Sequence, residues 1–340
     1  MTTYREAGVD IDAAEKAKQR IKEYVKETRN ELSVMDAGFF CGGIKADFAG
    51  YKEPALMLST DGVGTKMAIA RMMSKYDTVG YDVVNHCAND ILTSGAKPIF
   101  FLDYIASDRI NPEIAAQLVK GVAEACRKLN VVLAGGETAQ MPGTYMKGEH
   151  ELAGTMGGVV ERAEIIDGSS IKEGDALIGI ASTGLHTNGY SLARKIAFET
   201  AGLKTDSHVP ELGRAIGNVL LEPHREYVTA ILELKKTCGI KGIAHITGGG
   251  ITDNLPRILP NGIGAEIRKG AWEILPIFKW LQEKGNVPEE DMHRTFNMGI
   301  GLIIAVDKKE AIGTWGRLKQ MGEKAWIIGQ AKPGKGVMYA

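Results

Sequence analysis

Apolar runs and apolar positions at helical spacing alternate along the chain. The run Ala55–Leu58 predicts a buried strand, and the pattern from Met67 to Met73 predicts a helix soon after it. Apolar side chains three or four residues apart predict an amphipathic helix over 11–29, with Asp12 as N-cap and Glu15 in the capping-box position. The chain therefore opens with a helix, a strand and a second helix.

The same patterns predict a regular succession of elements through the rest of the chain. Helices are expected where apolar positions recur at helical spacing, and strands where short apolar runs stand between turn residues. The expected helices are 77–95, 112–129, 189–200, 222–237, 272–284 and 308–321. The expected strands, besides the run at 131–134, are 98–107, 152–162, 176–182, 242–246, 264–268, 302–306 and 325–330.

The order of these elements predicts an α/β or α+β protein of two domains. A chain of 340 residues is longer than most single domains. A polar segment around 167–170 interrupts the pattern, so we expect domains over 1–168 and 169–340. Both halves use glycine turns followed by helices, but no strict repeat relates them.

Composition narrows the class of protein. A net charge of −1 gives no global basic field for nucleic acid or for an anionic membrane. No apolar run reaches membrane-spanning length, and the N-terminal stretch lacks the apolar core of a signal peptide. The four cysteines form no C-x-x-C pair, which is typical of reduced thiols rather than a disulfide framework or a zinc site. These features predict a soluble, cytoplasmic protein.

The stretch S-T-D-G-V-G-T-K, residues 59–66, joins the first predicted strand to a helix. Backbone N–H groups at such a turn attract an anion, because the first helical turn leaves them without partners. Gly62 and Gly64 let the backbone approach a phosphate closely, and Lys66 adds positive charge. The carboxylate of Asp61 suits such a place if a divalent cation lies between it and the phosphate. A glycine turn with a capping Asp explains the octapeptide equally well.

Two further carboxylates lie where a cation could be held. Asp90 falls on the apolar stripe of the helix predicted over 77–95, and a buried charge is costly unless it is paired or binds a metal. Asn89 is a possible helper. Glu137 follows the glycine pair 135–136 at the end of a predicted strand, where ligand sites gather. For Asp90, pairing with an Arg or a backbone N–H is the alternative.

The lysines of the first helix and the glycine-rich segment 36–52 each allow both a structural and a functional interpretation. Lys18, Lys22 and Lys26 line one face of the first helix, which is either a solvated basic stripe or a face from which Lys22 reaches a nucleotide phosphate. The glycine-rich segment 36–52 fits a mobile loop or a lid. Cys41 within it is either a reactive thiol or an incidental loop cysteine.

The second half repeats the combination of strand, glycine turn and helix with neutral donors. T-G-L-H-T-N-G-Y-S places His186 in the turn, where an imidazole can serve as acid, base or phosphate donor. A capping or solvent-exposed histidine is the alternative. The segment 247–254, T-G-G-G-I-T-D-N, forms a second glycine-rich cradle. Asn297, Gly299 and Gly301 lie either beside a substrate or in a plain glycine turn.

Eight motifs in order resemble phosphoribosylformylglycinamidine cyclo-ligases, also called aminoimidazole ribonucleotide synthetases. They are E-A-G-V-D-I-D, S-T-D-G-V-G-T-K, the N-D at 89–90, G-A-K-P-I-F-F-L-D-Y, G-G-E-T-A-Q-M-P-G, T-G-L-H-T-N-G-Y-S-L-A-R-K, H-I-T-G-G-G and R-T-F-N-M-G-I-G. The resemblance runs from about residue 6 to residue 330. Leu185, where some relatives carry Pro, and Thr252-Asp253, in place of an aromatic–Glu pair, depart from the family pattern.

The resemblance implies a reaction and a fold. The reaction is the ATP-dependent closure of formylglycinamidine ribonucleotide to 5-aminoimidazole ribonucleotide, through an iminophosphate, with release of ADP and phosphate. The implied fold is α+β in two domains. Strands of the N-terminal domain join those of a second subunit in a barrel shared across a homodimer, and the C-terminal domain is a sheet covered by helices, with the active site between the domains.

The resemblance also implies roles for individual residues. Asp61, Asp90 and Glu137 would hold Mg²⁺ on ATP, and His186, Lys22 and Asp90 would be catalytic. The substrate side would use the turn around His186 and the glycine cradle. The implied ATP-binding residues are Asp61, Gly62, Gly64, Thr65, Lys66, Asn89, Gly136 and Glu137, and the implied substrate-binding residues are Thr183, Gly184, Asn188, Gly189, Gly248, Gly249 and Gly250.

Other functions on the same scaffold are the alternatives. Selenophosphate synthetase would want a reactive Cys before a glycine–lysine segment, and Cys41-Gly42-Gly43-Ile44-Lys45 matches that only faintly. Thiamine-monophosphate kinase would lack the H-I-T-G-G-G and F-N-M-G-I-G segments in this form. A non-catalytic nucleotide-binding protein would be expected to lose carboxylates such as Asp61, and they are present.

Overall fold

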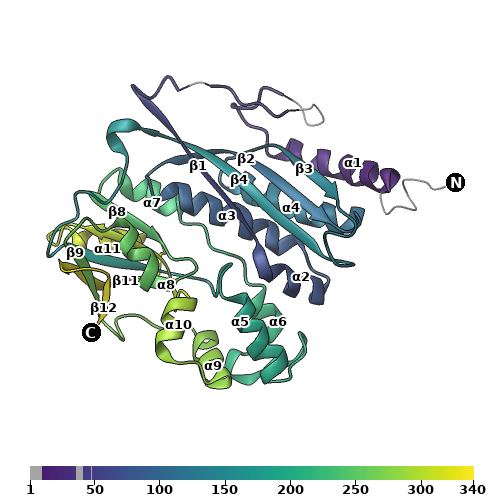
Figure 1. Cartoon of the computed structure of the whole chain (residues 1–340). Helices are drawn as coiled ribbons and strands as arrows, with labels where there is room; N and C mark the ends of the chain where they lie inside the picture. The colour runs from purple at the N-terminus through teal and green to yellow at the C-terminus, as the bar shows by residue number, and fades with distance from the viewer. Residues whose placement is uncertain (1–9, 36–40, 47) are drawn as a thin grey trace. The chain divides into compact units, whose positions relative to one another are not determined.

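The computed structural model describes residues 10–35, 41–46 and 48–340, and these fold into two compact units (Figure 1). The first unit comprises 1–91 and 98–161, and the second comprises 92–97 and 162–340. The chain therefore passes from one unit to the other after Glu161, and the short segment Leu92–Lys97 belongs to the second unit. Part of the expected lid at 36–52 lies outside the described residues.

The first unit is a four-stranded sheet with helices on one face (Figure 1). The strand order is β1-β4-β2-β3, with β1 antiparallel to β4 and β2 parallel to β3. The strands are β1 Pro54–Gly62, β2 Lys97–Ser107, β3 Val132–Gln140 and β4 His150–Glu161. The helices are α1 Ile11–Glu27, α2 Met67–Met73, α3 Asp77–Leu92 and α4 Pro112–Lys128.

Helices α3 and α4 pack closely because glycines stand where they meet. A Cβ on Gly121 of α4 would lie 1.9 Å from the carbonyl oxygen of Asp77, and one on Gly80 of α3 would lie 2.4 Å from the Val122 nitrogen. Only glycine allows two helix backbones to approach this far. Helix α1 packs on α4 through a small cluster around Ala17.

The other face of this sheet carries exposed apolar side chains. Leu56 and Leu58 of β1 are 55% and 68% exposed, and Leu102 and Tyr104 of β2 are each 37% exposed. Alternation along a strand sends neighbouring side chains to opposite faces, so these residues share the face away from Phe101, which is fully buried. We call the face of Leu56, Leu58, Leu102 and Tyr104 the open face.

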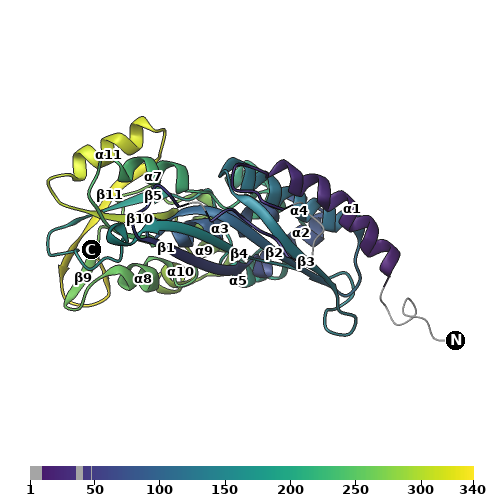
Figure 2. The same cartoon turned by 90° about the horizontal axis from the view of Figure 1, so that it is seen from above.

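The second unit is built on a six-stranded sheet with helices on both faces (Figure 2). Its order is β12-β9-β11-β5-β10-β8, and every pairing is antiparallel except β12 with β9. The strands are β5 Ala176–Ala181, β8 Ile240–His245, β9 Ile263–Ile267, β10 Ile300–Val306, β11 Ala325–Pro333 and β12 Val337–Tyr339. A two-stranded ribbon is formed by β6 His208–Val209 and β7 Arg214–Ala215.

Apolar side chains of the central strands form the core of the second unit. Residues of β5 and β10 are buried throughout, because helices cover both sides of these strands. Helices α7 and α11 pack on one side, and α8 packs near β12. The helices are α5 Tyr190–Arg194, which continues as a π-helix over Lys195–Thr200, α6 Ile216–Leu220, α7 Val228–Lys235, α8 Gly250–Asn254, α9 Pro276–Gly285, α10 Glu289–Thr295 and α11 Ala311–Gln320.

Most predicted elements are present, but several helices begin at another residue, and the short strands β6, β7 and β12 were not predicted. The first helix is capped by Asp10, whose side chain accepts from the Ala13 nitrogen, so the prediction of Asp12 as N-cap was wrong. The helix expected over 272–284 begins at Pro276, because the residue before a proline is held extended. The helix expected from 222 begins only at Val228, and α10 was not predicted although three acidic residues mark its first turn.

The fold is thus mixed α+β in two units, as expected. Among the described residues no helix is both long and apolar enough to cross a membrane.

Candidate functional site

The turn after β1 places Asp61 at the edge of the first unit. A single 3-10 turn over Gly64–Lys66 follows β1 and leads into α2. The Asp61 carboxylate accepts a 2.7 Å hydrogen bond from the nitrogen of Gly62 through Oδ1. Gly64 adopts φ +63°, a conformation that favours glycine, and Thr65 beside it is exposed. The expected strand, glycine turn and helix are therefore all present.

A histidine that was not predicted joins two of the expected metal ligands. His86 of α3 is 2% exposed, and its Nε2 lies 2.8 Å from Asp61 Oδ2 and 3.9 Å from Asp90 Oδ2. The hydroxyl of Ser59 donates to Asp90 Oδ2 at 3.1 Å. Asp61 and Asp90 are thus brought together. His86 stands four residues before Asp90, so helical spacing was a signal that could have revealed it.

Burial and neighbouring charges shift the pKa values of Asp61 and His86 in opposite directions. Burial by itself raises the pKa of Asp61, but the hydrogen bond and the charge of His86 outweigh it, so the pKa lies below the usual value. Burial by itself lowers the pKa of His86, but the hydrogen bond that His86 donates to Asp61 and the charges of Asp90 and Asp61 raise it above the usual value. Both directions favour an ion pair in which His86 is protonated and Asp61 is ionised.

The group has the donor chemistry that a divalent cation requires. The side chains of Asp61 and Asp90 keep 40% and 32% of their surface exposed, so their oxygens are accessible. Carboxylate oxygens suit Mg²⁺, and a cation between them would relieve the repulsion of two neighbouring negative charges. Asn89, the expected helper, is fully buried on α3.

Lys66 is engaged inside the first unit. Its side chain is fully buried, and its Nζ lies 2.8 Å from Asp82 Oδ2 and 2.9 Å from Oδ1. Asp82 is also fully buried and was not predicted. A buried lysine needs such a partner, because an unpaired charge in the interior is costly. The pair fixes the start of α2 on α3, and its burial weighs against the predicted contact of Lys66 with phosphate.

Glu137 and Lys22 are not brought to Asp61 within one chain. Glu137 is exposed on β3 and pairs in register with Tyr104, so it lies on the open face, whereas Asp61 lies on the helix-covered face. Strands β1 and β3 are the two edges of the sheet, about 14 Å apart at 4.8 Å per strand. Lys22 is exposed on α1, which packs beside β3 and α4.

Gly136 has a structural reason to be glycine. A Cβ at Gly136 would lie 1.6 Å from Oδ1 of Asp103 on β2, so the absence of a side chain makes room for that carboxylate. Burial raises the pKa of Asp103 to about 7. Asp103 stands in the F-F-L-D-Y segment and was not predicted as a titrating group.

In the second unit, the turn after β5 holds His186 in a sparsely populated conformation. His186 has φ +63°, which costs a residue with a Cβ roughly 1–3 kcal/mol and is most often kept at functional sites. Its Nε2 accepts a 3.2 Å hydrogen bond from the nitrogen of Thr183, whose hydroxyl donates to the carbonyl of Pro223 at 2.7 Å. His186 is 1% exposed, so the prediction of a solvent-exposed histidine does not apply.

Asn297, in the segment between α10 and β10, fixes the same turn. Its side-chain nitrogen donates to the carbonyl of Gly184 at 2.9 Å, and its oxygen accepts from the hydroxyl of Ser182 at 3.0 Å. The F-N-M-G-I-G segment therefore orients the turn that carries His186. A Cβ at Gly301 would lie 2.6 Å from Cε1 of His186, so glycine is required where the imidazole rests on β10.

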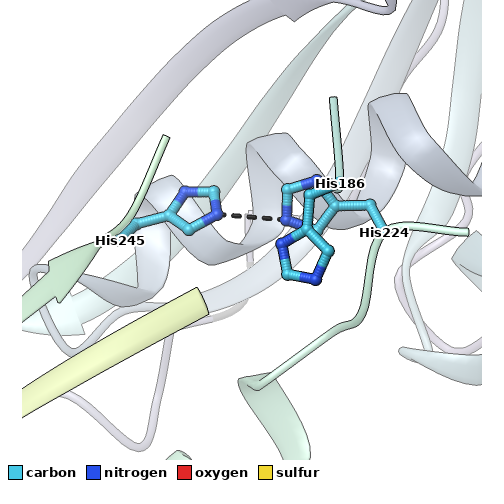
Figure 3. A group of neighbouring side chains, drawn as sticks. All are labelled: His186, His224 and His245. Atoms are coloured by element: carbon cyan, nitrogen blue, oxygen red, sulfur yellow. Dashed lines mark hydrogen bonds between the residues drawn. The ribbon is translucent and has the colours of Figure 1, made fainter. Parts of the chain in front are cut away.

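Three buried histidines meet beside this turn (Figure 3). The ring of His224 stacks on that of His186, with centroids 4.0 Å apart and planes 20° apart. The Nε2 atoms of His224 and His245 are 3.1 Å apart. Their exposures are 1% for His186 and His224 and 5% for His245. Neither His224 nor His245 was predicted; the position of His245 just before the glycine cradle was the available signal.

The glycine cradle lies against the expected substrate residues. Gly248 stands next to Asn188, because a Cβ on it would lie 3.4 Å from the Asn188 amide nitrogen. The amide of Asn254 donates to the carbonyls of Gly248 and Gly250 and holds the turn. Gly189 and Gly249 have φ of +79° and +97°. Within the described residues, Oδ1 of Asn188 is a buried acceptor with no hydrogen-bond partner.

Known proteins resemble the chain over nearly its full length. Family models described as AIR synthase related protein match residues 45–160 with the N-terminal domain and 172–339 with the C-terminal domain. The phosphoribosylformylglycinamidine cyclo-ligase of Trichlorobacter lovleyi is 49% identical over 97% of this chain and 95% of that protein. The enzyme of the same name from Carboxydothermus hydrogenoformans is 51% identical over 98% of this chain and 97% of its own.

Solved structures share the fold at lower identity. The thiamine-monophosphate kinase of Stenotrophomonas maltophilia superposes with a TM-score of 0.70 at 16% identity, covering 94% of each chain. The hydrogenase maturation protein HypE of E. coli gives a TM-score of 0.67 at 20% identity, covering 93% of this chain and 91% of that one. A HypE structure in complex with ATP gives 0.64 at 18% identity, covering 93% and 88%. At these low sequence identities, the similarity shows only that the proteins share a fold.

Proposed function

The chain belongs to the phosphoribosylformylglycinamidine cyclo-ligase family, and we propose how its residues share the family's reaction. Relatives about half identical cover almost the whole chain, and this full-length likeness carries the assignment. The protein is an ATP-dependent ligase of purine biosynthesis that closes the imidazole ring of 5-aminoimidazole ribonucleotide. Other superfamily activities, such as selenophosphate synthesis, remain the alternatives that the experiment below tests.

The proposed course of the reaction has two steps. The formyl oxygen of formylglycinamidine ribonucleotide attacks the terminal phosphorus of ATP, which forms an iminophosphate and releases ADP. The amidine nitrogen then attacks the activated carbon, the C–O bond to phosphate breaks, and a proton is lost as the ring becomes aromatic. Catalysis of this type depends on positioning and on neutralising phosphate charge. The chain must therefore bind both a polyphosphate and a polar substrate.

The proposed polyphosphate side uses the group at the end of β1. Asp61 and Asp90 present accessible oxygens beside each other, which supports binding of Mg²⁺-ATP there. A bound Mg²⁺ would neutralise charge on the phosphates. The backbone N–H groups of Gly64 and Thr65 would face the phosphate oxygens, and the N–H of Gly62 orients the carboxylate of Asp61. Lys66 supports this site by holding the turn on α3 through Asp82.

The proposed substrate side uses the second unit. His186, held at positive φ, is the group we assign to carry the proton that the closing ring loses. Oδ1 of Asn188, which has no hydrogen-bond partner among the described residues and lies next to Gly248, supports hydrogen bonding to the substrate. Thr183, Gly184, Gly189, Gly249 and Gly250 shape the two turns between which the substrate would be held. These roles assign polyphosphate to residues 1–168 and substrate to 169–340.

A homodimer is the assembly we propose. The open face carries four exposed apolar side chains on adjacent parts of one sheet, and burying such a face is favourable. Glu137 and Lys22 lie at the β3 edge, away from Asp61 of the same chain. If a second copy covers the open face, Glu137 and Lys22 of one chain could serve the site of the other. Sedimentation of the Leu58→Glu variant and of the parent chain would test this, because a charge on the open face should dissociate the dimer. A monomeric parent chain would refute the homodimer.

The compartment that we propose is the cytoplasm. Among the described residues the four cysteines are free, which fits a reducing environment.

The test is a turnover assay with formylglycinamidine ribonucleotide, ATP and Mg²⁺. It would follow ADP release and the aminoimidazole product in the same sample. We expect equal amounts of both, and we expect Asp61→Asn and Asp90→Asn to lose most turnover at limiting Mg²⁺. ADP without the imidazole would indicate another activity of the superfamily. ATP binding with neither product would overturn the ligase assignment.

A further inference from the structure

We propose that His224, His245 and His186 form a binding site for a first-row transition-metal ion of the Zn²⁺ class. It lies wholly within the second unit, where the turn after β5, the segment before α7 and the end of β8 converge (Figure 3).

The spacing of two ring nitrogens is what carries the inference. Nε2 of His224 and Nε2 of His245 are 3.1 Å apart. Two nitrogens bound tetrahedrally to Zn²⁺ at about 2.0–2.1 Å stand about 3.3 Å apart. An ion can therefore replace the proton that the two rings otherwise share, once both rings turn so that their lone pairs converge on it.

The second nitrogen of His224 has the partner that a metal-binding histidine needs. Nδ1 of His224 lies 3.3 Å from the hydroxyl of Thr187, which can accept its proton. A ligating imidazole usually donates its other N–H to an oxygen, because this fixes the tautomer and turns the free lone pair toward the ion. Thr187 thus leaves Nε2 of His224 as the atom that ligates.

His186 supplies the third ligand when its Nε2 exchanges the hydrogen bond from the Thr183 nitrogen for the ion, so a bound ion would occupy the ring that we otherwise assign to carry the proton. A ring nitrogen of His186 lies within 4.8 Å of the ligand atoms of His224 and His245. Its ring is stacked on His224, so a change of ring tilt is needed before its lone pair meets the ion. Three histidines and an open fourth position form a known zinc ligand set. Mg²⁺ prefers oxygen ligands, so this set selects against the cation proposed for the first unit.

Burial holds the rings of His224 and His245 in place, although the His186 ring must still tilt. All three rings are at least 95% buried, and Pro223, next to His224, is tied to the His186 turn through the hydroxyl of Thr183. A rigid set of ligands loses little conformational entropy when an ion binds.

The experiment is a titration of the metal-free full-length protein with Co²⁺ and then Zn²⁺, with excess Mg²⁺ present. We expect one Co²⁺ per chain, with the strong visible absorption of a four-coordinate ion, and displacement by Zn²⁺. His224→Phe keeps an aromatic ring against His186 but removes the ligand. This variant and His245→Phe should weaken binding beyond the roughly 10–100-fold that loss of an outer partner causes.

One variant serves as the control. His208 is exposed on β6, and His208→Asn should bind Co²⁺ as the parent chain does. Absence of Co²⁺ binding, or equal binding by His224→Phe and His245→Phe, would overturn the site. If these variants do not fold, zinc X-ray absorption of the parent chain decides: fewer than two imidazole ligands refutes the proposal.

Discussion

Nε2 of His86 lies 2.8 Å from Oδ2 of Asp61, and this contact joins the two elements to which we assign the proposed polyphosphate side of the site. Asp61 ends β1, and His86 is buried in the middle of α3. Since the Gly62 nitrogen donates to Oδ1, both oxygens of Asp61 are oriented by the protein. A carboxylate held in this way is preorganised for a cation.

His86→Leu should weaken binding of the divalent cation by roughly 10–100-fold, the range for loss of an outer-shell partner. The reason is that Asp61 loses the donor that fixes its carboxylate. Calorimetry with Mg²⁺-ATP, or paramagnetic resonance of bound Mn²⁺, would measure the change. His86→Gln, which can keep a donor, should recover part of the affinity. Equal affinity in His86→Leu and the parent chain would show that Asp61 is fixed by other contacts.

Lys66 and Asp82 form a buried ion pair, so replacing one of them should destabilise the fold more than replacing both. Lys66→Met or Asp82→Leu alone should lower the free energy of unfolding by about 3–5 kcal/mol, because each leaves a buried charge without its partner. The double variant should recover most of that loss. Denaturant unfolding measures all three.

The same double variant separates two roles of Lys66. If Lys66 acts only through the pair, a folded double variant should bind ATP much as the parent chain does. A folded double variant that has lost ATP affinity would restore the predicted contact between Lys66 and phosphate.

The raised pKa of Asp103 predicts how the free energy of unfolding depends on pH. Its folded-state pKa of about 7 lies above the ordinary value of about 3.9 for an aspartate. Between these values the folded chain keeps a proton that the unfolded chain has lost, so stability falls as pH rises from about 4 to about 7. Asp103→Asn should remove this part of the slope. Thermal unfolding across that range would show it, and an unchanged slope would mean that Asp103 ionises normally in the folded chain.

Gly301 tests the placement of His186. Gly301→Ala would put a methyl group 2.0 Å from the hydroxyl of Tyr227 and 2.6 Å from Cε1 of His186, so one ring must move. We expect turnover to fall while ATP affinity is kept. The matched control is Gly313→Ala in α11, where a Cβ meets nothing within 4 Å and alanine favours the helix by about 1 kcal/mol. Full turnover by Gly301→Ala would separate His186 from the reaction.

Local sequence was enough to predict most helices and strands and part of the candidate site. The helix over Met67–Met73 and the turn before it followed from apolar spacing and two glycines. Asp61 and Asp90 were singled out because a carboxylate behind a glycine turn and another on an apolar helix stripe both need a partner. The motifs from residue 6 to residue 330 placed the chain in its family, since each depends only on short stretches of neighbouring residues.

Only the tertiary structure decides which of these side chains contact one another. Asp82 is sixteen residues from Lys66, and His224 and His245 are distant in sequence from His186, so neither local spacing nor local hydrophobicity could place them together. Glu137 looked equivalent to Asp61 along the chain, yet sheet order puts the two at opposite edges. Periodicity specifies which face of an element is buried, whereas the order and register of strands decide which charged side chains meet.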